Sequence, residues 1–221
     1  MTGTLAFDVY GTLIDTHGVV TALREQVGEE APRFSQRWRE KQLEYSFRRG
    51  LMGAYDDFAV CTRQALDYTC QALNMPLSES VRAALMASYR TLPAFDDVAT
   101  GLAAVRQAGH RTFAFSNGSA DAVNQLLSHA GLDSQMDGTV SVEGVRSFKP
   151  NPAVYRHFVS ETQSELASTW LISSNPFDVI GAQHAGWKTI WLQRDPAAVF
   201  DPWNIEPTCT VTTLAAVADC L

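Results

Sequence analysis

The stretch "LAFDVYGTLID", residues 5–15, joins an apolar run to an aspartate and a Gly-Thr turn near the start of the chain. The apolar run predicts a buried strand over residues 4–9, with Asp8 near its carboxyl end. Burying a carboxylate that has no partner is costly. The stretch therefore raises two questions: what Asp8 does at this position, and what Tyr10, two residues later, indicates.

Composition and charge limit the class of protein. The chain has 221 residues, 46% of them hydrophobic and 19% charged, which is typical of a compact globular protein of one or two domains. The formal net charge is −7 and the basic residues are interleaved with acidic and aromatic ones, so we expect no nucleic-acid partner. Neither a signal-peptide pattern nor an apolar run of membrane-spanning length occurs, so we expect a cytoplasmic protein without a membrane partner.

Cysteines and histidines give no sign of a metal site. The four cysteines, Cys61, Cys70, Cys209 and Cys220, lack C-x-x-C spacing and are few for this length, which favours free thiols in a reducing compartment over disulfides. No two of the five histidines have zinc-ligand spacing. We therefore expect free cysteines and no zinc ion.

Strand-like and helix-like patterns alternate along much of the chain. Apolar runs followed by small polar residues recur at 111–119 and 169–178, and another apolar run spans 188–194. Helical patterns occupy about 97–107, 119–130, 152–161 and 177–185. This alternation predicts an α/β fold with a Rossmann-like parallel sheet covered by helices on both faces. Ligands of such sheets bind beyond the carboxyl ends of the strands.

Residues 15–92 interrupt this alternation. They are nearly all helical in pattern, and "RFSQRWREKQLEYSFRR", residues 33–49, carries aromatic residues at helical spacing. We expect a helical cap domain over 15–92, inserted into a core made of 1–14 and 93–221. The aromatic stripe is expected to pack within the cap; it consists of Phe34, Trp38, Tyr45 and Phe47.

Polar side chains follow three of the predicted strands. The first strand is followed by Asp8 and Thr12, the second by Ser116 and Asn117, and the third by Ser173, Ser174, Asn175 and Asp178. Lys149, in "SFKPNPAVY", precedes a helix start. A single such Asp is usually a turn or cap residue and a single Lys is usually a surface group. Together, at one edge of a sheet, these residues predict a site for an anionic substrate.

This constellation, in this order, resembles the haloacid dehalogenase superfamily over nearly the whole chain. Most members of that superfamily are magnesium-dependent phosphatases with a second aspartate two residues after the nucleophilic one. Here that position is Tyr10, and a phenol with a reference pKa near 10 neither shuttles protons as a carboxyl does nor supplies a hard anionic oxygen for magnesium. Asp8 thus looks like a buried nucleophile, and the residue type at Tyr10 argues against phosphoryl transfer.

Several segments resemble those of the L-2-haloacid dehalogenases in order and approximate spacing. They are "FDVYGTLID", "RWREKQLEYSF", "FSNGS", "FKPNPAVY" and "SSNPFD". The resemblance implies hydrolysis of L-2-haloacids to D-2-hydroxyacids with inversion, through an ester on Asp8 and without a metal ion or other cofactor. It also makes a homodimer plausible.

The resemblance assigns roles position by position. Asp8 matches the nucleophile, and Arg39 matches the cap residue that receives the departing halide. Thr12 and Lys149 match partners of the nucleophilic carboxylate, while Ser116 and Asn117 match groups that bind the substrate carboxylate. The remaining matched active-site residues are Tyr155, Ser173, Asn175 and Asp178, and Tyr10, Leu43, Phe58 and Phe177 are expected in the substrate pocket.

Physical chemistry supports these roles independently of the resemblance. Displacement next to a carboxylate needs an ionised Asp8, which Lys149 and hydroxyl donors stabilise against burial. A guanidinium on a closing cap helps the halide to leave. Asp178 is the available general base for hydrolysis of the ester, with Asn175 as a group that orients the water.

The family commonly has Trp between Asn and Asp in the last motif, where this chain has Pro176 and Phe177. Phe keeps an apolar wall but loses the indole N–H and some bulk.

Other interpretations stay open at this point. Arg39 could merely cover a helix surface, Tyr155 could be a core aromatic residue and Asp178 a first-turn acid. Two alternative functions are a magnesium-dependent phosphatase of a small metabolite and a non-catalytic binding protein of the same fold.

Overall fold

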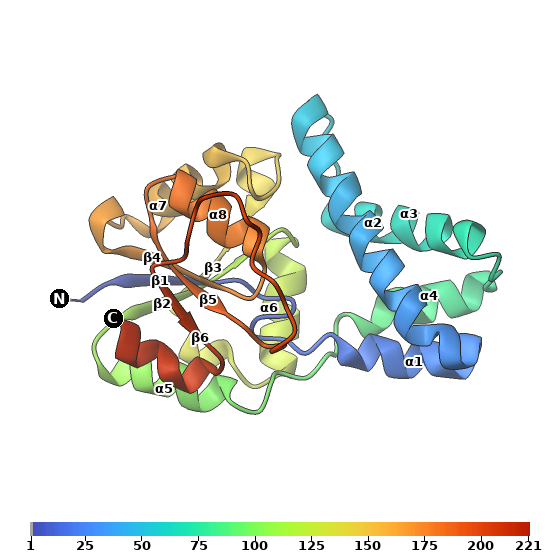
Figure 1. Cartoon of the computed structure of the whole chain (residues 1–221), viewed down its shortest axis with the longest axis horizontal. Coiled ribbons are helices and arrows are strands. Elements are labelled where there is room, and N and C mark those ends of the chain that lie inside the picture. The colour runs from blue at the N-terminus through green and yellow to red at the C-terminus, as the bar shows by residue number, and fades with distance from the viewer. Residues whose placement is uncertain (1) are drawn as a thin grey trace.

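The first strand, β1 (Thr4–Phe7), is buried on both faces inside a six-stranded parallel sheet. The structure is a computed structural model that describes residues 2–221 (Figure 1). The strand order is β3-β2-β1-β4-β5-β6. The other strands are β2 (Arg111–Ser116), β3 (Gly138–Ser141), β4 (Thr169–Ser173), β5 (Lys188–Leu192) and β6 (Cys209–Val211). The predicted α/β class with a parallel sheet is confirmed, and β3 and β6 are additional strands.

Helices cover both faces of this sheet because alternate residues of each strand point to opposite sides. Leu5 and Phe7 of β1 belong to the hydrophobic cluster with α5 (Val98–Gln107), α6 (Ala120–His129) and the 3-10 helix η5 (Leu214–Cys220). Ala6 belongs to a second cluster with α7 (Pro152–Thr162) and α8 (Pro176–His184). Four shorter 3-10 helices are η1 (Gly28–Glu30), η2 (Asp133–Gln135), η3 (Val142–Val145) and η4 (Leu166–Ser168).

Four α-helices and η1 lie between β1 and α5 and form the part to the right of the sheet in Figure 1. The α-helices are α1 (His17–Val27), α2 (Ala31–Met52), α3 (Phe58–Ala72) and α4 (Glu79–Ser88). The chain leaves and re-enters the sheet part side by side, because Asp15 N–H donates to the Pro93 carbonyl at 2.8 Å and Phe95 N–H donates to the Leu13 carbonyl at 3.1 Å. The insertion is helical as expected, and the boundaries at 14/15 and 92/93 remain an interpretation.

Two expectations need correction. Cys209 and Cys220 form a disulfide that joins β6 to η5, whereas Cys61 and Cys70 are free and buried. Spacing along the sequence does not show which cysteines the fold brings together, so the prediction of four free thiols is wrong for this pair. Phe47 does not pack only within the helical part, because its ring lies edge-on to Phe177 of α8 at a centroid distance of 5.2 Å.

Among residues 2–221, no helix combines the length and the apolar character needed to cross a membrane.

Candidate active site

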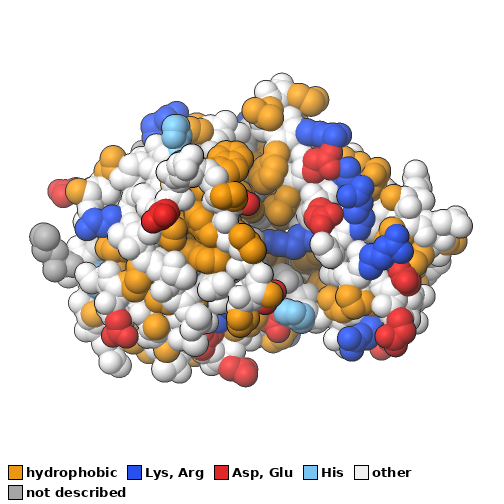
Figure 2. Space-filling view, in the orientation of Figure 1, with side chains coloured by type: hydrophobic (Ala, Val, Ile, Leu, Met, Phe, Trp, Pro, Cys, Tyr) orange, Lys and Arg blue, Asp and Glu red, His pale blue; other side chains and the backbone are white. Residues whose placement is uncertain are grey.

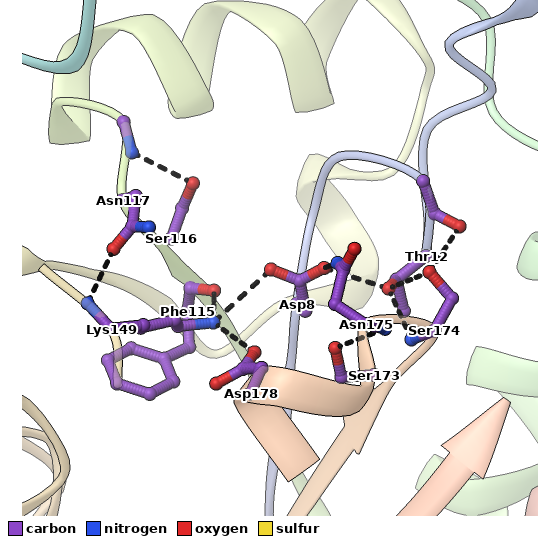
Figure 3. Close-up of polar contacts among 12 residues, drawn as sticks. Asp8, Thr12, Phe115, Ser116, Asn117, Lys149, Ser173, Ser174, Asn175 and Asp178 are labelled. Carbon is purple, nitrogen blue, oxygen red and sulfur yellow. Dashed lines mark hydrogen bonds and ion pairs between the residues drawn. The ribbon is translucent and has the colours of Figure 1, made fainter. Parts of the chain in front are cut away.

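Asp8 lies one residue beyond β1, and its carboxylate is held by three side chains from different parts of the chain (Figure 3). Thr12 Oγ1 and Asn175 Nδ2 each donate to Oδ2 at 2.8 Å, and Lys149 Nζ donates to Oδ1 at 3.2 Å. Donors of this kind stabilise the ionised form of a buried carboxyl group. Asp8 is thus a nearly buried carboxylate whose two oxygens are both oriented.

Lys149 is 1% exposed and is the centre of the polar cluster in Figure 3. Its ammonium group donates to Asp8, to Asp178 Oδ2 at 2.7 Å and to the Phe115 carbonyl at 2.9 Å, so all three of its hydrogens have an acceptor. Burial opposes its charge, but the two carboxylates outweigh this effect and raise the pKa of Lys149. Lys149 is therefore a cation held between two acids.

Asp178 is fully buried in the first turn of α8. Tyr155 O–H donates to its Oδ1 at 2.8 Å, and Lys149 donates to the other oxygen. Burial raises the pKa of Asp178, and the positive charge of Lys149 partly offsets this effect. The pKa of Tyr155 is raised well above its ordinary value, mainly by burial, so Tyr155 stays a proton-bearing donor. Asp178, whose pKa is raised by burial and which shares Lys149 with Asp8, is the available proton acceptor beside the nucleophile position.

The loop after β4 orients the other side of Asp8. Ser174 N–H donates to Thr12 Oγ1 at 2.9 Å, and Ser173 Oγ accepts from Asn175 N–H at 3.1 Å. Asn175 is the N-cap residue of α8, but its side chain does not cap the helix. It instead donates to Asp8 and accepts from Arg39 Nη2 at 2.8 Å, so this amide links the helical part to the nucleophile position.

Residues after β2 form the remaining wall of the site. Asn117 Oδ1 accepts from the backbone N–H of Lys149 at 2.9 Å, and Ser116 Oγ accepts from Gly118 N–H at 3.1 Å. Both residues line the cavity, and the Ser116 hydroxyl and the Asn117 amide are groups that can donate to a carboxylate ligand.

A cavity of about 600 Å³ lies over this edge of the sheet, between the sheet part and the helical part. Figure 2 shows the hollow between the two parts, with hydrophobic side chains along its walls. The cavity is lined by ten of the predicted residues: Asp8, Tyr10, Arg39, Leu43, Phe58, Ser116, Asn117, Lys149, Asn175 and Phe177. The other four, Thr12, Tyr155, Ser173 and Asp178, are buried behind these residues. Thr12, Ser173 and Asp178 form hydrogen bonds with cavity-lining residues, and Tyr155 forms one with Asp178. The structure therefore brings all the predicted site residues together.

The sequence did not single out three contributors. The Phe115 carbonyl accepts from Lys149, and a backbone acceptor has no residue-type signal. Gly181 of α8 lies so close to Tyr155 and Pro150 that a side chain there would overlap them, although the sequence shows only a glycine in a helix. Tyr89 lines the cavity from the end of α4, in a segment without a recognisable motif.

No group of three or more His, Cys, Asp or Glu side chains within residues 2–221 is arranged to hold a metal ion.

Comparisons with known proteins agree with this geometry. Residues 2–186 match the family described as haloacid dehalogenase-like hydrolase. The chain is 36% identical over 213 residues to haloacetate dehalogenase H-2 of Moraxella sp. (strain B), which covers 96% of this chain and 95% of that protein. It is 35% identical over 215 residues to (S)-2-haloacid dehalogenase of Pseudomonas sp. (strain YL), with 97% and 92% covered.

Solved structures show the same architecture. The L-2-haloacid dehalogenase from Xanthobacter autotrophicus superposes with a TM-score of 0.90 at 31% identity, covering 99% of this chain and 98% of that one. A structure of the same enzyme with chloropropionic acid covalently bound superposes with a TM-score of 0.89, with the same identity and coverage.

We expect Lys149→Met to lower the free energy of unfolding by about 3–5 kcal/mol near neutral pH, because it leaves two buried carboxylates without their cation. Lys149 holds the pKa of Asp178 down against the effect of burial, so without Lys149 the folded variant binds more protons than the unfolded chain as the pH falls. The deficit relative to wild type should narrow towards about pH 4.5 in denaturant titrations.

Lys188→Met, at an exposed residue of β5, is the matched control and should change stability little. A deficit of the same size at both pH values would show that Lys149 stabilises by packing rather than by charge.

Proposed function

Because the chain belongs to the haloacid dehalogenase-like hydrolases, we propose that it hydrolyses the carbon–halogen bond of L-2-haloacids and releases D-2-hydroxyacids. The observation that carries the proposal is the arrangement around Asp8: a nearly buried carboxylate, paired with Lys149, at the floor of an otherwise largely apolar cavity. The similarity to a dehalogenase with chloropropionic acid covalently bound supports a covalent intermediate.

In the first step a carboxylate oxygen of Asp8 attacks the carbon that bears the halogen. The new C–O bond forms as the carbon–halogen bond breaks, and the halide leaves with the bonding electron pair on the side opposite to Asp8. Arg39 reaches the cavity from α2 and already donates to Asn175, so its remaining guanidinium hydrogens are available for the forming anion. The product of this step is an ester on Asp8 with an inverted carbon centre.

Binding of the substrate carboxylate is assigned to the loop that carries Ser116 and Asn117, which lines the same cavity. The substituent on the reacting carbon is expected to contact apolar and aromatic side chains. These are Tyr10, Leu43, Phe58 and Phe177. The ring of Phe177 also packs against Phe47 of α2, so this wall is formed jointly by both parts of the chain.

In the second step water attacks the carbonyl carbon of the Asp8 ester. Asp178 accepts the proton of this water, and its raised pKa is closer to neutrality than that of an ordinary aspartate. Lys149 and Thr12, which contact the Asp8 oxygens in the free enzyme, stabilise the negative charge that develops there. The bond between the Asp8 carbonyl carbon and the ester oxygen then breaks, and that oxygen leaves with the product and takes up the proton from Asp178. Because the bond between the substrate carbon and this oxygen survives the step, the inversion is kept.

Further expectations belong to the same proposal. We assign α1–α4 to a cap that closes the cavity, and the core to residues 1–14 and 93–221. Exposed Leu51 and Met52 at the end of α2 offer an apolar contact for a second copy, which supports a homodimer. We propose a cytoplasmic location without nucleic-acid or membrane partners, although the Cys209–Cys220 disulfide favours a more oxidising compartment.

The phosphatase and the non-catalytic alternatives are not favoured. The relatives described above are dehalogenases, and Tyr10 stands where a phosphatase of this fold has its second aspartate. The Tyr10 ring lines the cavity, and burial raises the pKa of its phenol to about 12, so it supplies no anionic oxygen for magnesium.

We expect chloride release from L-2-chloropropionate and not from its D-enantiomer, unchanged by EDTA and abolished by Asp8→Asn. An amide at this position keeps the size of the side chain but is a far weaker nucleophile than a carboxylate. Release of inorganic phosphate from phosphorylated metabolites in the presence of magnesium, without chloride release from either enantiomer, would overturn the proposal.

We expect Asp178→Asn to form the ester but to hydrolyse it at least about a hundredfold more slowly, because the general base is lost. Rapid-quench measurements should then show one equivalent of chloride per site, followed by almost no turnover, and mass spectrometry should find the adduct on the peptide that contains Asp8. Full loss of the chloride burst in this variant would place Asp178 in the first step instead.

A further inference from the structure

Tyr89 lies at the C-terminal end of α4 and faces the same cavity as Asp8 and Arg39. Its ring is held edge-on by two neighbours, Trp38 at a centroid distance of 5.4 Å and Tyr10 at 6.1 Å. Trp38 is itself fixed, because its indole N–H donates to the Thr62 carbonyl at 2.8 Å. Tyr89 is therefore a side chain in a defined position rather than a free surface group.

The hydroxyl group of Tyr89 makes no hydrogen bond to another group within residues 2–221, and its oxygen is not among the fully buried polar atoms. A phenol at a largely apolar position usually has its hydroxyl satisfied. Tyr155 shows this rule in the same site, since its hydroxyl donates to Asp178. The Tyr89 hydroxyl lines the cavity and is therefore free to donate to a ligand bound there.

The surroundings of Tyr89 indicate what kind of ligand this is. Burial raises the pKa of its phenol to about 12, with opposition from the nearby charge of Arg39 and a smaller contribution from Tyr10. Tyr89 is thus a hydrogen-bond donor at every working pH, close to a guanidinium. A donor beside a guanidinium favours an anion.

The neighbours of Tyr89 indicate which part of the cavity it lines. Tyr89 contacts Trp38, the residue before Arg39 on α2, and the charge of Arg39 acts on its phenol. Its connection to the loop with Ser116 and Asn117 runs through the Tyr10 ring, which both Gly118 and Tyr89 contact. Tyr89 therefore belongs to the Arg39 side of the cavity.

We propose that the Tyr89 hydroxyl donates a hydrogen bond to the departing halide and shares that anion with Arg39. This inference rests on the proposed function. As the Asp8 oxygen forms its bond to carbon, the carbon–halogen bond breaks and its electron pair becomes a lone pair of the halide. The Tyr89 O–H and an Arg39 N–H donate to that ion, and no proton is transferred.

Tyr89→Phe tests the proposal because it removes only the hydroxyl group. A hydrogen bond to a charged group corresponds to about a tenfold to hundredfold effect on rate. We expect kcat/KM for L-2-chloropropionate to fall by about this factor and kcat/KM for L-2-bromopropionate to fall several-fold less, because bromide is larger and its charge is more diffuse. The ratio of bromide to chloride release should therefore rise by at least about threefold.

Inhibition gives a second readout that does not depend on turnover of the variant. Tyr89→Phe should weaken inhibition by chloride ion about tenfold while leaving inhibition by propionate unchanged. Tyr68→Phe is the matched control, because Tyr68 also lies on the helical part but its hydroxyl contacts Arg37 rather than the cavity. It should change neither quantity.

The assignment of Tyr89 would be overturned if Tyr89→Phe lowered kcat/KM equally for the chloride and bromide substrates. It would also be overturned if the variant weakened inhibition by propionate but not by chloride. Either result would leave the proposed function intact. Wild-type protein that releases no halide from any L-2-haloacid would instead show that the proposed function itself has failed.

Discussion

The site depends on one ammonium group shared by two buried carboxylates. Lys149 Nζ lies 3.2 Å from Asp8 and 2.7 Å from Asp178, and no other cation contacts either acid within residues 2–221. Burial alone would protonate the acids or discharge the lysine. The trio avoids this because Lys149 lies between the two acids and each of its three hydrogens has an acceptor. One carboxylate can then stay charged to attack carbon, while the other, with its raised pKa, is suited to accept a proton.

The fold places these three groups by a simple geometric rule. Parallel strands end at the same edge of a sheet, so Asp8 after β1, Lys149 in the segment after β3 and Asp178 after β4 converge although they are far apart in the sequence. Helix α2 forms the wall of the site that faces the sheet. Arg39, Leu43 and Phe47 are spaced four residues apart and therefore lie on one face of this helix. Arg39 reaches Asn175 and Phe47 reaches Phe177, so both contacts of α2 meet the start of α8.

Much of this arrangement could be predicted from the sequence. Asp8, Lys149 and Asp178 follow patterns that identify strand ends and helix starts, and these patterns place them together. Strands β3 and β6 were not predicted because neither contains an apolar run: Gly138–Ser141 has a single aliphatic residue, Val140, and Cys209–Val211 has only three residues. The Cys209–Cys220 disulfide, the close approach at Gly181 and the cavity position of Tyr89 depend on tertiary contacts that local patterns do not encode.

The central claim is that Asp8 itself forms the new bond to carbon, and the origin of the product oxygen tests it most directly. A single turnover in ¹⁸O-labelled water, with enzyme in excess over L-2-chloropropionate, should give a D-hydroxyacid whose new oxygen is unlabelled, because that oxygen comes from the Asp8 carboxylate. The label should appear in the peptide that contains Asp8. A first-turnover product carrying the label, with Asp8 unlabelled, would mean that water attacks the substrate directly and would contradict the account.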